Sequence, residues 1–340
     1  MIVTNPVLMI VLLVALLCCS AFFSGSETAL MAVSRLRLRH LAETKPVRAR
    51  LVERILKKPE RLIGTLIRLP ELRVMNRIRV TSWNELQESL FEESWNPEIG
   101  RFRSRFAFRG FSDGRYTLET TLIRLGGKFV ELERHILRNF RKYAHRNVVE
   151  RDSLWHWLSV AQHHGLPTRL LDWTYSPFIA AHFATANVDN FNVDGTVWAV
   201  NYVKAHELLP EKLRSQLKNE GANVFTVEML SESVKSLREL AELSEEGFTV
   251  FFEPPSIDDR IVNQFALFSV MSKSTATLDA WLPDHLETWR QLVIPAELKW
   301  EIRDKLDQAN ITERVLFPGL DGLGRWLKRQ YSPKMGRSTK

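Results

Sequence analysis

The chain has 340 residues, of which 45% are hydrophobic and 26% are charged, and its formal net charge is +7. This composition is typical of a folded protein and excludes a disordered or collagen-like chain. Between Arg35 and Arg79 there are 14 basic and 4 acidic residues, a balance of +10, so the rest of the chain carries −3. The larger part therefore lacks the excess positive charge that nucleic-acid binding requires, and we expect no nucleic-acid partner.

The first segment of the chain is apolar. Residues 7–23 contain no charged side chain, and with two apolar neighbours the stretch reaches roughly 20 residues, enough for a helix that crosses a membrane. Residues 1–6 lack the positive charge of a secretory signal. The arginines that follow the stretch, which by the positive-inside rule stay in the cytoplasm, are Arg35, Arg37 and Arg39. We predict a transmembrane helix within residues 1–24 and a single-pass membrane protein whose bulk is cytoplasmic.

Both cysteines, Cys18 and Cys19, lie inside the apolar stretch. The residues from Met75 onward contain none, so no disulfide can form there, which suits a reducing compartment. Met75 would also make a sensible start for an independent protein. The alternative that the chain begins at Met75 and is cytoplasmic and soluble stays open.

Residues 25–74 form a basic segment beside the predicted membrane helix. Apolar residues such as Leu36, Leu41 and Ile55 alternate there with arginine and lysine, which predicts amphipathic helices. Next to a membrane, residues 35–68 would attract anionic lipid headgroups, at about 1 kcal/mol per basic residue. The alternative is that these basic residues form an ordinary solvent-exposed helix face that does not bind lipid.

Part of this region resembles a known membrane family. The residues that carry the resemblance are Ser20–Leu30, Ser34–Ala42 and Lys58–Thr65. They are similar to the start of the transmembrane domain of the CorC/cyclin M family, which is linked to divalent-cation transport, over roughly residues 5–67. A transport path needs several helices to line it, and no second apolar run of spanning length follows in the sequence. We therefore do not expect transport by this chain.

Residues 75–340 read as one globular domain of mixed α and β structure. The helical patterns cover residues 83–91, 117–125, 128–143, 152–163, 178–186, 295–309 and 320–329. The strand patterns cover residues 104–111, 195–203, 248–252, 265–271 and 291–294. Ser82 with Glu85, Ser176 with Pro177, and Gly165 supply helix-end signals. Because helices and strands interleave without regular βαβ spacing, we predict an α+β fold with a mixed sheet.

Four blocks of this domain resemble the FRG domain, named for its phenylalanine-arginine-glycine signature. The blocks are Phe108–Gly110, Gln162–Trp173 with Ser176–Ala184, Arg260–Phe268 and Leu316–Leu323. The resemblance spans roughly residues 80–330. It implies little about mechanism, because this domain is functionally uncharacterised as a class.

Arg109 is the central candidate for ligand binding. A guanidinium is always charged and its planar fork suits phosphate or carboxylate, while Gly110 beside it would allow close approach. An aromatic-Arg-Gly triplet on an early strand is also similar to the motif that opens the arginine-serine-glutamate group of ADP-ribosyltransferases. That resemblance implies an ADP-ribosyltransferase-like fold in which the arginine holds NAD and a later glutamate steadies the ribose. Here the late block offers Gln264, which can hold a hydroxyl but brings no negative charge, so binding is favoured over transfer.

The segment Gln162–Trp173 supplies further candidates. Adjacent residues on a helix point about 100° apart, so His163 and His164 cannot both coordinate one metal ion from a single helix face. We therefore predict no metal site. We assign as candidate catalytic residues His164, Asp172 and Gln264. We assign as candidate ligand-binding residues Arg109, Gly110, His163, Thr168 and Arg169. The structural alternatives are that Thr168 and Asp172 brace turns, and that Arg109 or Arg169 pairs with Asp172.

The hypothesis that follows is a membrane-anchored FRG-like domain whose cleft binds an anionic small molecule, a nucleotide such as NAD. Two alternatives stay open. The domain is an interaction or scaffold module without chemistry, or it is an ADP-ribosyltransferase-like enzyme or NAD hydrolase. A glycine-rich phosphate loop and a Gly-x-Ser-x-Gly elbow are both missing from the sequence, which excludes kinase, Rossmann oxidoreductase and serine hydrolase functions.

Overall fold

The computed structural model describes residues 76–144 and 152–332, all within the unit Arg73–Lys340. The predicted transmembrane helix at residues 7–23 and the basic segment at 25–74 lie outside the described residues. Among the residues that are described, no helix is long and apolar enough to cross a membrane.

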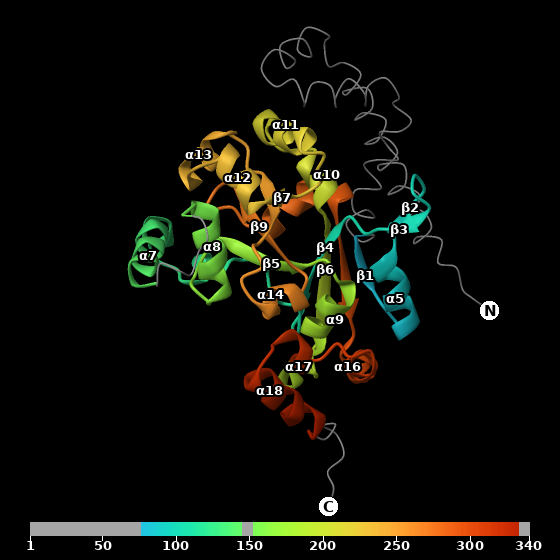
Figure 1. Cartoon of the computed structure of the whole chain (residues 1–340). Helices are drawn as coiled ribbons and strands as arrows, with labels where there is room; N and C mark the ends of the chain where they lie inside the picture. Colours follow the sequence, from blue (N-terminus) through green and yellow to red (C-terminus); the bar gives the residue numbers. More distant parts are fainter. Residues whose placement is uncertain (1–75, 145–151, 333–340) are drawn as a thin grey trace, which may run out of the picture. The chain divides into compact units, whose positions relative to one another are not determined.

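A mixed sheet forms the centre of the described part, with strand order β1-β10-β6-β4-β5-β9-β8-β7 (Figure 1). The strands are β1 (Arg77–Arg79), β4 (Phe106–Phe111), β5 (Leu170–Thr174), β6 (Gly195–Asn201), β7 (Phe225–Thr226), β8 (Thr249–Glu253), β9 (Ala266–Met271) and β10 (Trp289–Ile294). The pairs β1–β10 and β7–β8 are parallel and the other neighbours are antiparallel. A small hairpin of β2 (Trp95–Asn96) and β3 (Arg101–Phe102) stands apart. The prediction of an α+β fold with a mixed sheet is confirmed.

The sheet has a seam between β4 and β5. Strand β4 pairs with β6 over six positions and β5 pairs with β9 over five, but β4 and β5 are in register at a single pair, Phe108 with Thr174. Strand β4 therefore remains paired with β6 and β5 with β9, while β4 and β5 separate beyond the pair Phe108–Thr174. We call this opening the β4–β5 seam.

Helices surround the sheet. They are α5 (Trp83–Phe91), α6 (Thr121–Arg124), α7 (Phe129–Tyr143), α8 (Leu154–His163), α9 (Pro177–Thr185), α10 (Tyr202–His206), α11 (Glu211–Asn219), α12 (Val227–Ser233), α13 (Leu237–Glu242), α14 (Asp259–Asn263), α15 (Leu278–Trp281), α16 (Lys299–Gln308), α17 (Glu313–Leu316) and α18 (Leu320–Gln330). On one face, α5, α9 and α16 pack on β4, β6 and β10, while α8 and α12 pack on β5, β8 and β9. The other face is covered by α10 and α15, and Trp173 and Trp198 are buried there.

Helix-end signals placed several elements correctly. Ser82 caps α5 by accepting the Glu85 N–H, and Ser176 with Pro177 opens α9. Gly165 has φ +78°, as a glycine after a helix end requires. The predicted capping box differs in detail, because the Glu85 carboxylate accepts from Thr81 and not from the N-cap residue itself.

Three predicted boundaries were wrong. The strand expected over residues 195–203 ends at Asn201, whose side chain accepts the Lys204 N–H and starts α10. The helix expected over residues 117–125 is confined to α6, because Thr120 caps it. The end of the Gln162–Trp173 run, expected to be a turn, is strand β5.

His206 on α10 is a buried residue that predicts a pH dependence of folding. Its Nε2 accepts the Phe251 N–H at 2.9 Å, so Nδ1 carries the proton and donates to the Asn223 carbonyl at 2.9 Å. Both contacts require a neutral ring. Burial lowers the pKa of His206 to about 4, although the Asn223 carbonyl opposes this effect.

Stability should therefore fall as the pH drops below about 6.5, the pKa of histidine in an unfolded chain. Below that value His206 becomes protonated in the unfolded chain, whereas in the folded domain it stays neutral down to about pH 4. Between pH 6.5 and 5 this amounts to about 1.5 kcal/mol of unfolding free energy. Denaturant unfolding at both pH values measures it. His206→Gln, which can keep both contacts, should lose less stability over this interval; an unchanged pH slope in the variant would count against the assignment.

Candidate functional site

A cavity of about 210 Å³ lies at the β4–β5 seam. Five of the residues selected from the sequence border it: Arg109, Gly110, His163, Asp172 and Gln264. Its other lining residues include Phe108, Gln162, Thr174, Phe183, Arg260 and Phe268. His164, Thr168 and Arg169 are not among the lining residues. The seam thus brings residues from β4, α8, β5 and α14 to one place.

Arg109 reaches across the seam from β4 to β5. Its Nη1 donates to the main-chain carbonyl of Asp172 and lies 3.8 Å from the Asp172 carboxylate. The guanidinium also lies 5.0 Å from the centre of the Phe111 ring, and 18% of the side chain is exposed. Its Nε is buried and has no hydrogen-bond partner among the described residues.

The charge of Arg109 is therefore incompletely balanced. Burial lowers the pKa of Arg109, while the Asp172 carboxylate opposes this effect, and a guanidinium stays protonated at neutral pH. The opposing carboxylate is 58% exposed and so is screened by solvent. An incompletely balanced cation in a residue that lines a cavity favours an anion there.

Asp172 interrupts the apolar face of β5. Leu170 and Thr174 on the same face are buried, but Asp172 is exposed. Its carboxylate accepts from Gln162 Nε2 at 2.8 Å, and Gln162 Oε1 in turn accepts the Thr168 hydroxyl at 2.6 Å. The Thr168 hydroxyl also accepts the Leu170 N–H at 3.1 Å. Thr168 therefore braces the turn and positions Gln162, which holds Asp172.

The two adjacent histidines have different surroundings. His163 Nε2 lies 2.7 Å from the carboxylate of Asp258, the N-cap residue of α14, and so ties α8 to that helix. Burial works against ionisation of Asp258, but hydrogen bonds from Ile261 N–H and His163 outweigh it and lower the pKa of the carboxyl. His164 is exposed and contacts His163 edge-on at 5.2 Å between ring centres.

Arg169 is engaged elsewhere. Its guanidinium forms a two-pronged ion pair with Glu133 on α7, with Nε to Oε1 at 2.5 Å and Nη2 to Oε2. Both side chains are at least 90% buried. The expected alternative partner, Asp172, is not the one it uses. The sequence offered no signal for Glu133, which lies 36 residues earlier on another helix.

Gly110 has a clear structural role. A Cβ atom built on it would lie 1.8 Å from the Ala180 carbonyl oxygen and 2.7 Å from the Ala184 nitrogen. The backbone of α9 therefore rests directly on β4 at this point. The close approach that Gly110 permits is to a helix, and any contact with a ligand stays a prediction.

Gln264 is the C-cap residue of α14 and borders the cavity. Its Nε2 donates to the Leu316 carbonyl at 2.8 Å, and Asn263 similarly bonds Val315 at 3.0 Å, so α14 is fixed to α17. Phe265 follows with φ +46°, an unfavourable angle for a residue with a side chain, and turns the chain into β9. Gln264 and Ala266 both border the cavity as a result.

Sequence reasoning missed three polar lining residues, Gln162, Thr174 and Arg260. Arg260 on α14 is exposed, stacks 5.3 Å from the Phe317 ring centre and forms no ion pair within the described residues. It adds a second cation to the rim. Its position beside Gln264 in one sequence block was the available signal.

Comparisons with known proteins divide the chain into two regions. Residues 104–193 match the FRG domain, and residues 11–72 match the cyclin M transmembrane N-terminal domain. The chain is also 50% identical over 48 residues to the UPF0053 inner membrane protein YfjD of Escherichia coli (strain K12). That match covers 14% of this chain and 11% of the relative, so the chain matches about a tenth of YfjD. No solved structure matches. The chain thus combines a segment similar to the cyclin M transmembrane N-terminal domain with a later region that matches the FRG domain.

Proposed function

We propose that the cavity at the β4–β5 seam binds an anionic small molecule, a nucleotide such as NAD, with Arg109 as the anchor. The observation that supports this most is the state of Arg109, which is largely buried, keeps an unused Nε donor and has a solvent-screened carboxylate as its ion-pair partner. A ligand phosphate would accept from this guanidinium at the cavity wall. Arg260 on the rim would add to the attraction.

The size of the cavity limits what it can enclose. About 210 Å³ is less than the roughly 300–1,000 Å³ of sites that surround a whole drug-sized molecule. The cavity is large enough for one phosphate with its adjoining sugar. The remainder of a dinucleotide would lie on the open side, past Arg260 on α14.

A catalytic version of this function is an ADP-ribosyltransferase or an NAD hydrolase. It is favoured by the position of Gln264, which borders the same cavity as Arg109. An Asp172 carboxylate at the wall would supply the negative charge that Gln264 lacks and that an oxocarbenium-like transition state needs. His164 is not among the residues that line this cavity, so its candidate catalytic role has less support than that of Asp172.

A scaffold role is favoured by one contact. Arg109 donates to the Asp172 carbonyl, so it joins β4 to β5 where their ladder ends. Under that alternative, replacement of Arg109 unfolds the domain and removes no binding activity.

Calorimetric titration of the full chain in lipid nanodiscs tests the proposal. NAD, ADP-ribose and AMP should bind, whereas adenosine and nicotinamide, which have no phosphate, should bind at least tenfold more weakly. Equal affinity for AMP and adenosine would rule out an anion site. Release of nicotinamide from NAD, or a mass increase on a target protein, would show that the domain is an enzyme. Binding without turnover would show that it is a binding module.

For the membrane region, we propose a single-pass topology with the FRG domain in the cytoplasm and residues 35–68 against anionic lipid. Support comes from the uncharged stretch 7–23, the three arginines after it and the match to a membrane family. Protease digestion of right-side-out and inverted vesicles tests the orientation. The FRG domain should be degraded in inverted vesicles alone.

A further inference from the structure

A second cavity, of about 460 Å³, lies between the end of α9 and helix α18. It is bordered by His182, Phe183, Ala186, Asn187, Val188, Asp189, Glu313, Phe317, Arg325, Lys328, Arg329 and Ser332. We call it the α9–α18 cavity. Apart from Phe183, none of these residues borders the seam cavity.

His182 in this cavity has an unused donor. Arg303 Nη1 lies 2.7 Å from His182 Nδ1, and since a guanidinium only donates, Nδ1 must accept and the ring proton must be on Nε2. Nε2 makes no hydrogen bond of normal geometry among the described residues, although the Ile311 main chain lies near enough to oppose the lowering of the ring's pKa, and the side chain is fully buried. Burial and the charge of Arg303 lower the pKa of His182 to about 3, so the ring is neutral. An unpaired buried N–H is unfavourable unless something in the cavity accepts it.

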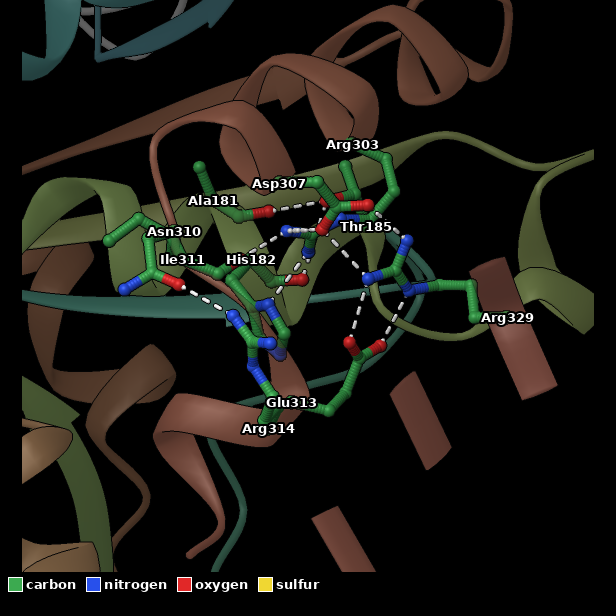
Figure 2. A network of polar contacts seen from close by, with 10 residues as sticks. All are labelled: Ala181, His182, Thr185, Arg303, Asp307, Asn310, Ile311, Glu313, Arg314 and Arg329. Carbon is green, nitrogen blue, oxygen red and sulfur yellow. Dashed lines mark hydrogen bonds and ion pairs between the residues drawn. The ribbon is translucent and has the colours of Figure 1, made fainter. Parts of the chain in front are cut away.

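The ring is held in this position by a buried network (Figure 2). Arg303 is bound by Asp307 at 3.0 Å, and Arg329 bonds both Asp307 and Glu313 at 2.6–2.8 Å. Arg303 and Arg329 engage Asp307 and Glu313, so neither acid accepts the His182 N–H. The donor is therefore rigid and pre-positioned.

The rim of the α9–α18 cavity is positively charged. Arg325 and Lys328 are exposed on α18 and form no ion pair within the described residues, whereas Arg329 and Glu313 neutralise each other. Asp189 is the opposing exposed acid among the lining residues. Two free cations against one acid favour an anionic group.

The walls are apolar and aromatic. Phe183 and Phe317 meet edge to face at 6.2 Å between ring centres, and Arg325 stacks 5.1 Å from the Phe317 ring centre. Ala186 and Val188 complete the apolar lining. A bare inorganic ion would leave these walls without a partner, whereas a flat apolar body would pack on them.

We propose that the α9–α18 cavity binds an organic carboxylate with an apolar, preferably aromatic, body. The carboxylate would face Arg325 and Lys328, and an acceptor oxygen would receive the His182 N–H. The site is independent of the nucleotide proposed at the seam.

Fluorine NMR titration of the full chain in nanodiscs tests this, with 4-fluorobenzoate as the probe. 4-Fluorobenzoate should bind, and 4-fluorobenzylamine and 4-fluorobenzyl alcohol should bind at least tenfold more weakly. The double variant Arg325→Gln/Lys328→Gln, which changes exposed residues alone, should weaken 4-fluorobenzoate at least tenfold. Lys218→Gln on α11, an exposed lysine outside the cavity, should have no effect.

His182→Gln is the second variant, and it should reduce the preference for the carboxylate over the alcohol. If His182→Gln does not fold, the result for Arg325→Gln/Lys328→Gln still tests the proposal. The proposal is overturned if the amine binds as well as the carboxylate, or if the double variant binds 4-fluorobenzoate as tightly as the natural chain. AMP binding at the seam should be unchanged in the double variant, so failure of one site is distinguishable from failure of the other.

Discussion

Replacing Gly110 by alanine is expected to destabilise the domain by about 3 kcal/mol or more, at the upper end of what overpacking causes. The added Cβ would lie 1.8 Å from the Ala180 carbonyl oxygen. That atom belongs to the backbone of α9, so no rotamer change can relieve the contact. The helix would have to move away from β4, which opens the core formed by Phe108, Ala180 and their neighbours.

Thermal unfolding followed by tryptophan fluorescence measures the effect of Gly110→Ala. For a domain of this size we expect the midpoint to fall by roughly 6–12 °C. Gly324→Ala is the matched control, because Gly324 lies inside helix α18 with no atom within 4 Å of its added Cβ. It should be neutral or stabilise by about 0.5–1 kcal/mol. Equal effects of the two substitutions would contradict the close packing of α9 on β4.

Arg169→Met is expected to destabilise the domain by about 3–5 kcal/mol, the range for breaking a buried ion pair. The substitution leaves the Glu133 carboxylate buried and without its two-pronged partner. Neither side chain is exposed enough for water to replace the lost contact. The effect should be on stability, because Arg169 does not border the seam cavity.

A double-mutant cycle separates this account from simple loss of packing. Arg169→Met/Glu133→Met removes both charges and should recover most of the stability lost in Arg169→Met. Arg238→Met breaks an exposed ion pair with Glu242 and should change the unfolding free energy by less than about 1 kcal/mol. If the double variant is as unstable as Arg169→Met, the buried charge is not the cause.

The elements predicted well from the sequence are those with strong local signals. Helix α9 begins where Ser176 and Pro177 set it, and α8 ends before Gly165, because caps and positive φ depend on a few neighbouring residues. Strand β5 was missed because Asp172 and the preceding polar residues hid a short strand. Its partners, β9 and β4, lie far away in the sequence, and local patterns carry no information on them.

The candidate site was predicted in part for the same reason. Arg109, Asp172 and Gln264 come from separate blocks, and the fold brings them to one cavity. The roles of Gly110 and Arg169 depend on contacts with Ala180 and Glu133, and no local sequence pattern indicates those contacts. Residue type therefore identified side chains that can bind a ligand, whereas tertiary contacts determine which of those side chains are free to do so.

The most direct test of the seam site is the dissociation constant of NAD for Arg109→Gln. We expect binding at least tenfold weaker than in the natural chain, with the unfolding midpoint unchanged within about 3 °C, as loss of a charge-assisted contact predicts. Arg101→Gln, at an exposed arginine on β3, should bind NAD normally. An unchanged NAD affinity in Arg109→Gln, or a loss of affinity that comes with unfolding of the domain, would contradict a ligand site at the β4–β5 seam.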